Sequence, residues 1–480
     1  MTFNQIWQFR QEFAMHARMD QRITGWKRYV LVEPPLMILI FAQAISSNIL
    51  TDLIVYRVCS VTLNINKSEC MLMHENSSSP EALRIDAKVQ PEATVILISQ
   101  TFIQSIFPAF LSLFLGPWSD KHGRKPILIL GYIGVTLTYF IFSFMTIWDI
   151  SPWFLLIAYI PSACFGGFCI ILLGSICYIS DISDEQDRAK HLAWMETLIF
   201  VGVISGLLIG PIIFRTYGYT YVFGIATICC ILAGSYICCL TPETICNRNS
   251  ITLGSLFDIH LVKELISTCT KKRDGFNRYI VWCCIIVIIL SVLILTGDMN
   301  IGLLFTSARL GWDVNKYSIF IAIKLSLITF GIIFGVNVLT TYTGFSEEAI
   351  TMLSLFSILC SSLVQSFTWK SWHMYLSAAI GAFSGVATPM IRTILSKSIP
   401  AKDTGKVFSL VVSIETLIPS AATSLYGMIY SHFMPPTYPL PVWLVSAGIC
   451  IIEILVLINM RRQNKKHNRM VYEPLIQDNE

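Results

Sequence analysis

Ionisable side chains inside long apolar runs are the first candidates for chemistry in this sequence. Glu196 and Glu415 each lie in such a run, as do Arg392, Lys324 and Asp298. A charged side chain at the centre of a membrane helix costs about 2.5–3.5 kcal/mol on insertion scales, so each needs a partner or a function. Carboxyl groups can take up and release protons, whereas a guanidinium can bind a carboxylate or phosphate through two parallel hydrogen bonds. These residue types therefore predict proton transfer and anion binding.

Each of these residues also has a structural alternative. Glu196 and Glu415 are predicted to carry protons, although Glu196 could instead be a fixed partner of a nearby basic residue or helix end. Arg392 is predicted to bind substrate, and its alternative is to extend its guanidinium to the lipid headgroups. Lys324 either faces a substrate cavity as an anion ligand or pairs with Asp298.

The apolar runs that position these residues exclude a soluble protein. The chain has 480 residues, of which 54% are hydrophobic and only 13% charged, whereas soluble domains have roughly 25% charged residues. The net charge is only +4, and the basic residues lie in short clusters between the apolar runs, which excludes a disordered or a nucleic-acid-binding protein. A helix that crosses the hydrocarbon core needs about 20 apolar residues. The sequence contains twelve such runs, at residues 30–56, 93–116, 127–147, 153–180, 191–214, 219–240, 278–305, 317–340, 349–367, 372–395, 407–430 and 440–460.

The continuity of these runs predicts helices. Only helices and closed barrels satisfy every backbone hydrogen bond in lipid, and a barrel strand would alternate in polarity. We therefore expect an all-α membrane protein whose twelve transmembrane helices form two six-helix bundles. The predicted segments are a cytosolic N-terminus at 1–29 without the apolar core of a signal peptide, bundles at 30–240 and 278–460, an extracellular loop at 57–92, a cytosolic central loop at 241–277 and a cytosolic tail at 461–480.

Lys and Arg residues in the loops predict the orientation, because cytosolic loops carry an excess of them. With the N-terminus inside, 24 of the 34 Lys and Arg residues lie on the cytosolic side and 8 on the outer side. Both termini are then cytosolic, as an even number of spans requires. The sequence predicts a multi-pass protein embedded in the lipid bilayer of the plasma membrane or of an endolysosomal membrane.

The predicted extracellular loop contains candidate modification sites. The two Asn-x-Ser/Thr sequons of the chain begin at Asn66 and Asn76 and are predicted glycosylation sites. Among the fifteen cysteines, only Cys59 and Cys70 face the oxidising side, so these two can pair as a disulfide.

The predicted tail contains a candidate sorting motif. Residues Tyr472 to Leu475 read Tyr-Glu-Pro-Leu, a Tyr-x-x-bulky pattern. Endocytic adaptors read such patterns in flexible cytosolic tails, and four-residue matches also arise by chance. Adaptor binding through Tyr472 and Leu475 is therefore one of two interpretations.

No enzymatic constellation is present in the sequence. It contains no CxxC pair with zinc-ribbon spacing and no HExxH motif, and none of its eight histidines lies deep in an apolar run. We predict no metal, no cofactor and no enzyme activity, with protons as the coupling ion.

The two halves of the chain share a short repeat. Glu196–Ile199 in span five and Glu415–Ile418 in span eleven both read Glu-Thr-Leu-Ile, about two turns into each run. Span eleven corresponds to span five if the two bundles are a parallel repeat. Such repeats are typical of transporters whose binding site lies between two bundles.

The segment between spans two and three has the most specific pattern. Gly116–Pro126 reads GPWSDKHGRKP. Gly123 can adopt the backbone angles of a sharp turn, and Asp120 and Arg124 can make charge-assisted hydrogen bonds to helix ends. The segment resembles the signature loop of the major facilitator superfamily, Gly-x-x-x-Asp-x-x-Gly-Arg-Arg/Lys. This resemblance implies a twelve-helix transporter and a monomer.

Further motifs resemble solute carrier family 46 within that superfamily, over nearly the whole chain. The motifs are Val32–Pro34, Trp118–Asp120, Asp181–Ser183, Trp312–Asp313, Thr388–Arg392 and Phe408–Ser409. The resemblance implies alternating access, with Glu196 associated with proton coupling and Arg392 with substrate handling. It also implies a cytosolic latch made by Asp120, Arg124, Asp181 and Arg188.

The most economical hypothesis is proton-coupled import of an organic anion, folate-like or related. Two departures from the folate transporters of that family argue against folate itself: span seven contains no histidine, and Gly311 stands where they have a cysteine. The alternatives are another solute, such as a cyclic dinucleotide, cell-wall peptide or steroid conjugate, or an exchanger. A receptor without transport is disfavoured, because an inert scaffold has no reason to keep charges inside its spans.

Overall fold

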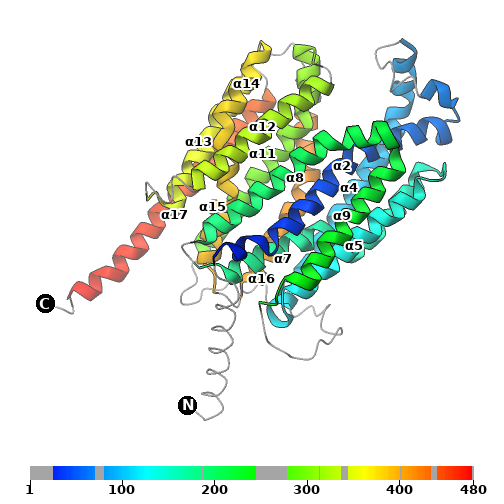
Figure 1. Ribbon diagram of the computed structural model, residues 1–480. Coiled ribbons are helices and arrows are strands. Elements are labelled where there is room, and N and C mark those ends of the chain that lie inside the picture. Colours follow the sequence, from blue (N-terminus) through cyan, green and yellow to red (C-terminus); the bar gives the residue numbers. More distant parts are fainter. Residues whose placement is uncertain are drawn as a thin grey trace.

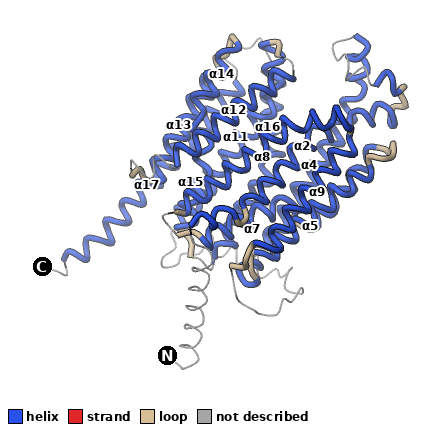
Figure 2. The backbone as a smooth tube through the Cα atoms, in the orientation of Figure 1, coloured by secondary structure: helices blue, strands red, loops and turns tan. Residues whose placement is uncertain are grey.

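Helices make up every regular element in the part of the chain that the structure describes. The structure is a computed structural model and describes residues 25–70, 80–184, 187–244, 278–312, 314–336, 344–400, 403–433 and 441–477. Within these ranges, twelve helical stretches are long and apolar enough to cross a membrane, from Arg28–Thr62 to Pro441–Gln463. The predicted all-α membrane fold is confirmed, and Figures 1 and 2 show the helices packed side by side.

Each half of the chain contributes six spans. The first half consists of η1 (Gly25–Val30), α2 (Glu33–Arg57), η2 (Val58–Thr62), α4 (Pro80–His122), α5 (Lys125–Met145), η3 (Pro152–Tyr159), α6 (Ile160–Cys164), α7 (Gly167–Ile182), α8 (Arg188–Tyr217) and α9 (Tyr219–Leu240). The second half consists of α11 (Arg278–Leu310), α12 (Val314–Phe334), α13 (Glu347–Ser366), α14 (Ser371–Ile380), η6 (Gly381–Val386), α15 (Ala387–Lys397), α16 (Thr404–His432) and α17 (Pro441–Gln477).

Local sequence signals mark where several helices begin. Pro34 lies in the first turn of α2, Pro126 in that of α5, and Pro152 opens η3. Proline suits a first turn because it has no N–H group to leave unpaired there. At the start of α13, the Ser346 hydroxyl accepts the N–H of Ala349 at 3.3 Å. Between the helix ends, the apolar segments stay helical because lipid offers no water to hydrogen-bond the backbone, and a helix pairs its own N–H and C=O groups.

The two bundles meet along a central contact. In the first half α2 packs against α8 and α9, and in the second half α11 packs against α16 and α17. Between the halves, α4 packs against α16 and α8 packs against α12 (Figure 1). In a parallel repeat, span two (α4) corresponds to span eight (α12), and span five (α8) corresponds to span eleven (α16). Each of these two contacts is therefore the equivalent of the other. The largest cluster of buried apolar side chains spans both halves and includes Leu36, Ile176, Val281 and Phe408.

Span two begins earlier than its hydropathy predicts. A loop was expected through residue 92, whereas α4 begins at Pro80. Residues 81–90 read EALRIDAKVQ, and most of these are strong helix formers. A polar helical segment therefore precedes the apolar one. Apolar length identifies the residues that can cross lipid but does not locate the start of the helix.

Spans four and ten are interrupted, although each was expected as one continuous helix. Span four consists of η3, α6 and α7, and the α6–α7 break contains Gly166 at φ 76° and Gly167 at φ 46°. Span ten consists of α14, η6 and α15. Left-handed backbone angles favour glycine, which explains the break in span four. The two interrupted spans occupy equivalent places in the repeat.

The glycines of span five hold α8 close to α2. A Cβ atom on Gly202 would lie 2.8 Å from the Met37 carbonyl oxygen, and one on Gly206 would lie 2.5 Å from the Ala44 Cβ. Small residues at four-residue spacing let helix backbones approach closely. Close packing of α8 against α2 therefore accounts for the four-residue spacing of Gly202 and Gly206.

The last helix continues beyond the predicted end of span twelve at residue 460. Helix α17 extends to Gln477, and Figure 1 shows its end leaving the bundle. Residues 461–466 read RRQNKK, and Arg, Gln and Lys favour helix. The sorting pattern at Tyr472 and Leu475 therefore lies in a helical extension and not in a flexible tail.

Candidate functional site

Arg392 lies between two glutamates at the contact between the halves. It belongs to α15, whereas Glu196 belongs to α8 and Glu415 to α16. The Arg392 guanidinium donates Nη1 to Glu196 Oε1, and donates Nη2 to both carboxylate oxygens of Glu415 at 3.1 and 3.2 Å. The side chains are 5%, 13% and 7% exposed, in the order Arg392, Glu196, Glu415. These three predicted site residues form one cluster, which we call the central triad.

The central triad contains two acidic groups and one permanent cation. With both carboxylates ionised, its net charge is negative in a site removed from water, which costs free energy. One proton on either carboxyl group makes the cluster neutral. The Arg392 Nε–H is buried and has no hydrogen-bond partner in the part of the chain that is described. The guanidinium thus holds both glutamates and keeps one donor for a further acceptor.

The internal repeat explains why two glutamates face one arginine. Glu196 and Glu415 occupy matching positions, so the parallel halves bring them to the central contact from opposite sides. The following threonines match as well, because Thr197 donates to the Ala193 carbonyl oxygen at 2.8 Å and Thr416 to that of Val412 at 2.7 Å. Helix α7, which is equivalent to α15, contains no arginine or lysine. One arginine therefore serves both glutamates.

The signature loop forms a second buried charge cluster. Arg124 donates Nε to Asp181 Oδ2 at 2.9 Å and Nη1 to Ser119 Oγ at 2.6 Å, and its Nη2 lies 2.7 Å from Asp120 Oδ1. Burial opposes the charge of this guanidinium, but Asp181 and Asp120 outweigh it and raise the pKa of Arg124. Three of the four predicted latch residues are therefore in contact.

Asp120 connects the two halves. Its carboxylate accepts the N–H of Gly405 at 2.9 Å and that of Lys406 at 3.1 Å, in the first turn of α16. The unpaired N–H groups and the dipole at a helix N-terminus stabilise an anion there. Gly116 permits the approach, because a Cβ atom at that position would lie 2.7 Å from the Gly405 carbonyl oxygen. We call this end of the molecule the signature end.

Glu243 completes the signature loop, and the sequence analysis missed it. Its carboxylate accepts the N–H of Arg124 at 2.7 Å and that of Lys125 at 3.1 Å, at the start of α5. Gly123 has φ 109°, and a Cβ atom there would lie 2.5 Å from Glu243 Oε2, so the turn requires glycine. An acidic residue directly after span six was the available signal.

Arg188 forms a separate bridge between the halves. It donates Nη1 to Ser396 Oγ of α15 at 3.0 Å, and Nη2 to the carbonyl oxygens of Ser180 and Ser183 at 3.2 and 3.3 Å. The predicted latch is thus divided into the Arg124 cluster and this bridge. The bridges made by Asp120 and Arg188 both join the first half to the second.

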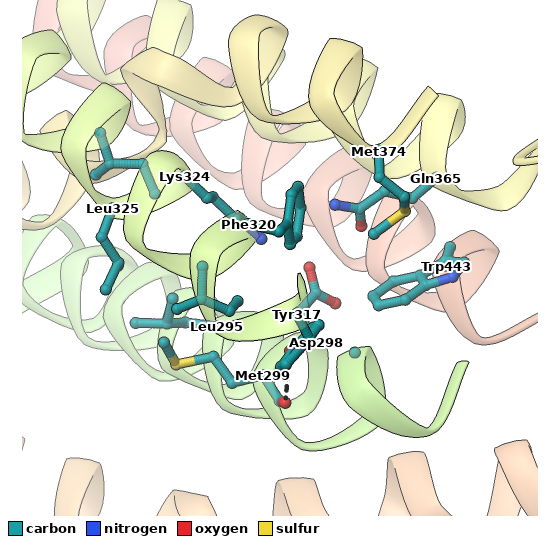
Figure 3. Close-up of a pocket in the computed structure, with 13 residues that line it drawn as sticks. Leu295, Asp298, Met299, Tyr317, Phe320, Lys324, Leu325, Gln365, Met374 and Trp443 are labelled. Atoms are coloured by element: carbon teal, nitrogen blue, oxygen red, sulfur yellow. Dashed lines mark hydrogen bonds between the residues drawn. The ribbon is translucent and has the colours of Figure 1, made fainter. Parts of the chain in front are cut away.

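Asp298 and Lys324 lie apart from the central triad, at a cavity inside the second half. Asp298 of α11 and Lys324 of α12 both line it (Figure 3). Asp298 accepts a hydrogen bond from Ser446 Oγ of α17 at 2.8 Å. Of the two interpretations of Lys324, the structure favours the cavity: Lys324 lines it, and no ion pair joins Lys324 to Asp298 among the described residues.

The predicted extracellular loop contains one disulfide. Cys59 and Cys70 are bonded, with their Cα atoms 6.0 Å apart. Asn66 lies exposed between them, and Asn76 lies outside the described residues. In the described ranges, no group of three or more His, Cys, Asp or Glu side chains is arranged to hold a metal ion.

The chain matches one family model. Residues 91–346, more than half of the chain, match the model described as Major Facilitator Superfamily. The chain belongs to the major facilitator superfamily. This superfamily comprises membrane transporters, so the protein is a transporter and not an enzyme.

Curated relatives of this major facilitator protein include members of solute carrier family 46. It is 28% identical to a Drosophila melanogaster protein named "Probable peptidoglycan muropeptide transporter SLC46", over 93% of this chain and 88% of that protein. It is 24% identical to the lysosomal proton-coupled steroid conjugate and bile acid symporter of Gallus gallus, over 90% and 94%. It is 23% identical to the proton-coupled folate transporter of Rattus norvegicus, over 89% and 91%.

Solved structures show the same fold. The human organic anion transporter MFSD10 aligns with a TM-score of 0.69 at 14% identity, covering 90% of this chain and all of that chain. The transporter FucP in its outward conformation aligns with a TM-score of 0.61 at 13% identity, covering 90% and 99%. At these identities the likeness establishes the two-bundle fold alone.

Proposed function

We propose that this chain imports an organic anion together with protons by alternating access. The observation that carries the proposal is Arg392, a buried permanent cation held between two carboxyl groups at the contact between the halves. A guanidinium binds carboxylates and phosphates in two-pronged fashion, so a substrate anion can take the place of one glutamate. The proton is the only coupling ion in this proposal, and no other cofactor takes part.

Proton binding and anion binding depend on each other at the central triad. A proton on Glu196 or Glu415 neutralises one anionic partner of Arg392 and frees guanidinium N–H groups. A substrate anion then binds to these N–H groups, and the net charge of the site returns to its value with both carboxylates ionised. When the substrate leaves, the glutamate returns to Arg392 and its proton departs. Proton and anion therefore travel in the same direction.

Alternating access requires the signature end to open and close. Asp120 with the start of α16, and Arg188 with Ser396, hold that end together in this structure. We place the signature end in the cytosol, since 24 of the 34 Lys and Arg residues fall on that side. Substrate then enters from the outer or lumenal side and leaves after these bonds open, which makes the protein an importer.

We also propose a cellular setting that agrees with this orientation. The protein works as a monomer in the plasma membrane or an endolysosomal membrane, with both termini cytosolic and glycans at Asn66 and Asn76. Tyr472 and Leu475 then lie on the cytosolic side, where an adaptor could bind them only after the helical extension unwinds. A relative that acts in lysosomes supports the endolysosomal alternative.

Muropeptides are the first substrate class to test. The relative named for muropeptide transport is 28% identical to this chain, compared with 23% for the folate transporter. A muropeptide is an amino sugar joined to a short peptide and carries carboxylates that Arg392 can bind. The absence of a histidine in span seven also argues against folate.

The test is acid-driven uptake in cells that express the chain at their surface. Labelled muropeptide, folate and a steroid sulfate are offered at about pH 5.5 and about pH 7.4, a range over which a proton gradient drives symport. Wild type should take up the muropeptide faster in acid. Glu196→Gln and Arg392→Ala should each reduce uptake at least tenfold, which corresponds to about 1.4 kcal/mol.

The matched control is Glu347→Gln. Glu347 pairs with Lys397 on α15, and both side chains are about one-quarter exposed. A partly exposed pair contributes little to stability, so this variant should transport like wild type. Absence of acid-stimulated uptake of any of the three anions, at normal surface expression, would contradict the proposal.

A further inference from the structure

Two adjacent cysteines lie exposed at one end of α9. Cys238 and Cys239 belong to the last turn of this helix, which ends at Leu240. Of the eleven free cysteines among the described residues, six are buried, and Cys164 is the only other exposed one. Free cysteine is one of the most buried residue types, because it behaves as a small apolar side chain. Packing in a core therefore does not account for this pair.

The pair continues the lipid-facing side of α9. This helix packs against α5, α2 and α8 of its own half, and Figures 1 and 2 show it beside α5 in the first bundle. Its side chains Ile228, Ile231 and Leu232 are apolar and at least half exposed. The two cysteines follow Ile231 and Leu232 by seven residues, or about two helical turns, so they lie on the same face. Exposed apolar side chains on a membrane helix face the lipid.

The contacts of this last turn place it at the level of the lipid headgroups. The Cys238 carbonyl oxygen accepts a hydrogen bond from Lys125 Nζ at 2.7 Å. Lys125 belongs to the signature loop and begins α5. Lysine side chains near the ends of membrane helices extend to the headgroups. The two cysteines thus lie at the signature end, where the hydrocarbon core gives way to water.

A thiol in this position can form a thioester with a fatty acid. The cysteine sulfur, as the thiolate, attacks the thioester carbonyl carbon of a long-chain acyl coenzyme A. A C–S bond to the cysteine forms, the C–S bond to coenzyme A breaks, and the coenzyme A thiolate takes up the proton that the cysteine gave up. Cysteines next to the membrane surface are typical sites of this reversible modification.

The apolar face of α9 offers the acyl chain a place in the bilayer. Cys239 and Ile228 are eleven residues apart, which is about 16 Å along the helix. This length is about half of the roughly 30 Å hydrocarbon core. One leaflet of lipid chains fills that depth. An acyl chain attached at Cys239 can therefore lie against exposed apolar side chains over the depth of one leaflet.

We propose that Cys238 and Cys239 form a site of S-acylation, in which one or both sulfurs are joined through a thioester to a long-chain fatty acid. The inference rests on the proposed function in one respect, namely the orientation that places the signature end in the cytosol, where acyl coenzyme A is available. It adds a lipid attachment to the first half, apart from the central triad and from the bridges between the halves.

Metabolic labelling of cells that express the full-length chain tests the inference. The cells receive an alkyne analogue of palmitate, and the purified chain is coupled to a fluorescent azide. Wild type should be labelled, and neutral hydroxylamine, which cleaves thioesters but not amides, should remove the label. Cys238→Ala/Cys239→Ala should lower the label at least tenfold at equal expression. The matched control is Cys164→Ala, which removes an exposed cysteine inside span four and should keep the wild-type label.

The double variant keeps Cys246 and Cys269 of the central loop, so acylation there would leave the label in place. A label that persists in the double variant, or no hydroxylamine-sensitive label in wild type, overturns the inference. The pair would then be only lipid-facing apolar residues. Mass spectrometry of wild type gives the same answer without a variant, because the acyl mass should fall on the peptide that contains Cys238 and Cys239.

A membrane-impermeant maleimide separates this inference from the proposed function. It is applied after hydroxylamine to cells with the chain at their surface, and the reaction of the pair is the difference between wild type and the double variant. The pair should react only after permeabilisation. Acylation of the pair supports the inference even if acid-driven uptake is absent, which would count against the proposed function alone. Unacylated thiols that react only after permeabilisation overturn the inference alone, whereas reaction in intact cells overturns both the orientation and the inference.

Discussion

Replacing Arg392 by methionine should destabilise the protein unless the two glutamates are also neutralised. The change removes three hydrogen bonds and leaves Glu196 and Glu415 buried without their cation. Removing one partner of a buried ion pair costs about 3–5 kcal/mol, because the other charge is left unpaired. Most of that cost comes from the stranded carboxylates. The triple variant Arg392→Met/Glu196→Gln/Glu415→Gln should therefore recover most of the lost stability.

Thermal unfolding of the purified protein in detergent measures this effect. At neutral pH the single variant should unfold several degrees below wild type, and the triple variant close to wild type. Acid should reduce the difference. In the folded single variant, the two buried carboxyl groups have lost their cation and bind protons at a pH at which the same groups are still ionised in the unfolded chain. By linkage, a folded state that binds more protons than the unfolded state becomes more stable as the pH falls.

The matched control is Lys397→Met, which breaks the partly exposed pair with Glu347 and should cost only about 0–1 kcal/mol. Two results would refute the reasoning. One is a single variant that unfolds at the wild-type temperature. The other is a triple variant that unfolds as early as the single variant. Either would mean that the central triad is not an energetic unit.

Three further changes test other parts of the structure. Asp120→Asn weakens the bonds to Arg124 and to the start of α16. It should lower uptake at least tenfold, which corresponds to about 1.4 kcal/mol. Normal uptake would exclude Asp120 as the connection between the halves. Gly206→Val places a Cβ atom 2.5 Å from the Ala44 Cβ and should cost about 1–3 kcal/mol, seen as a lower unfolding temperature; an unchanged temperature would contradict the close packing. Cys59→Ser should lower the free energy of unfolding by about 2–4 kcal/mol and free the Cys70 thiol for alkylation under non-reducing conditions. Alkylation of Cys70 in wild type would show that the disulfide is absent.

The fold could be predicted from the sequence because lipid imposes one dominant constraint. Apolar length alone located twelve spans, since a chain in lipid must satisfy its backbone internally. The same measure could not see the polar start of α4 at Pro80 or the interruption of span four at Gly166. Those features depend on helix propensity and on backbone angles, to which hydropathy is insensitive.

The candidate site was predictable in its residues but not in its grouping. The free-energy cost of a charged side chain inside a membrane helix identified Glu196, Arg392 and Glu415 separately as candidates. Only the packing of α8, α15 and α16 shows that one guanidinium binds both carboxylates. Lys324 had two interpretations, and among the described residues it lines a cavity and forms no ion pair with Asp298, which accepts a hydrogen bond from Ser446 of a third helix. Such contacts depend on helix rotation, which a single sequence does not specify.

Substrate-driven proton entry into liposomes tests the central claim most directly. The purified chain is reconstituted with a pH-sensitive dye inside, and muropeptide is added outside at a fixed mildly acidic pH. The account predicts that substrate acidifies the lumen with wild type, and that Glu196→Gln/Glu415→Gln abolishes this signal while Arg392 is intact. Acidification that persists in that double variant, or muropeptide uptake without any proton entry in wild type, would contradict the claim that the central triad couples protons to anions.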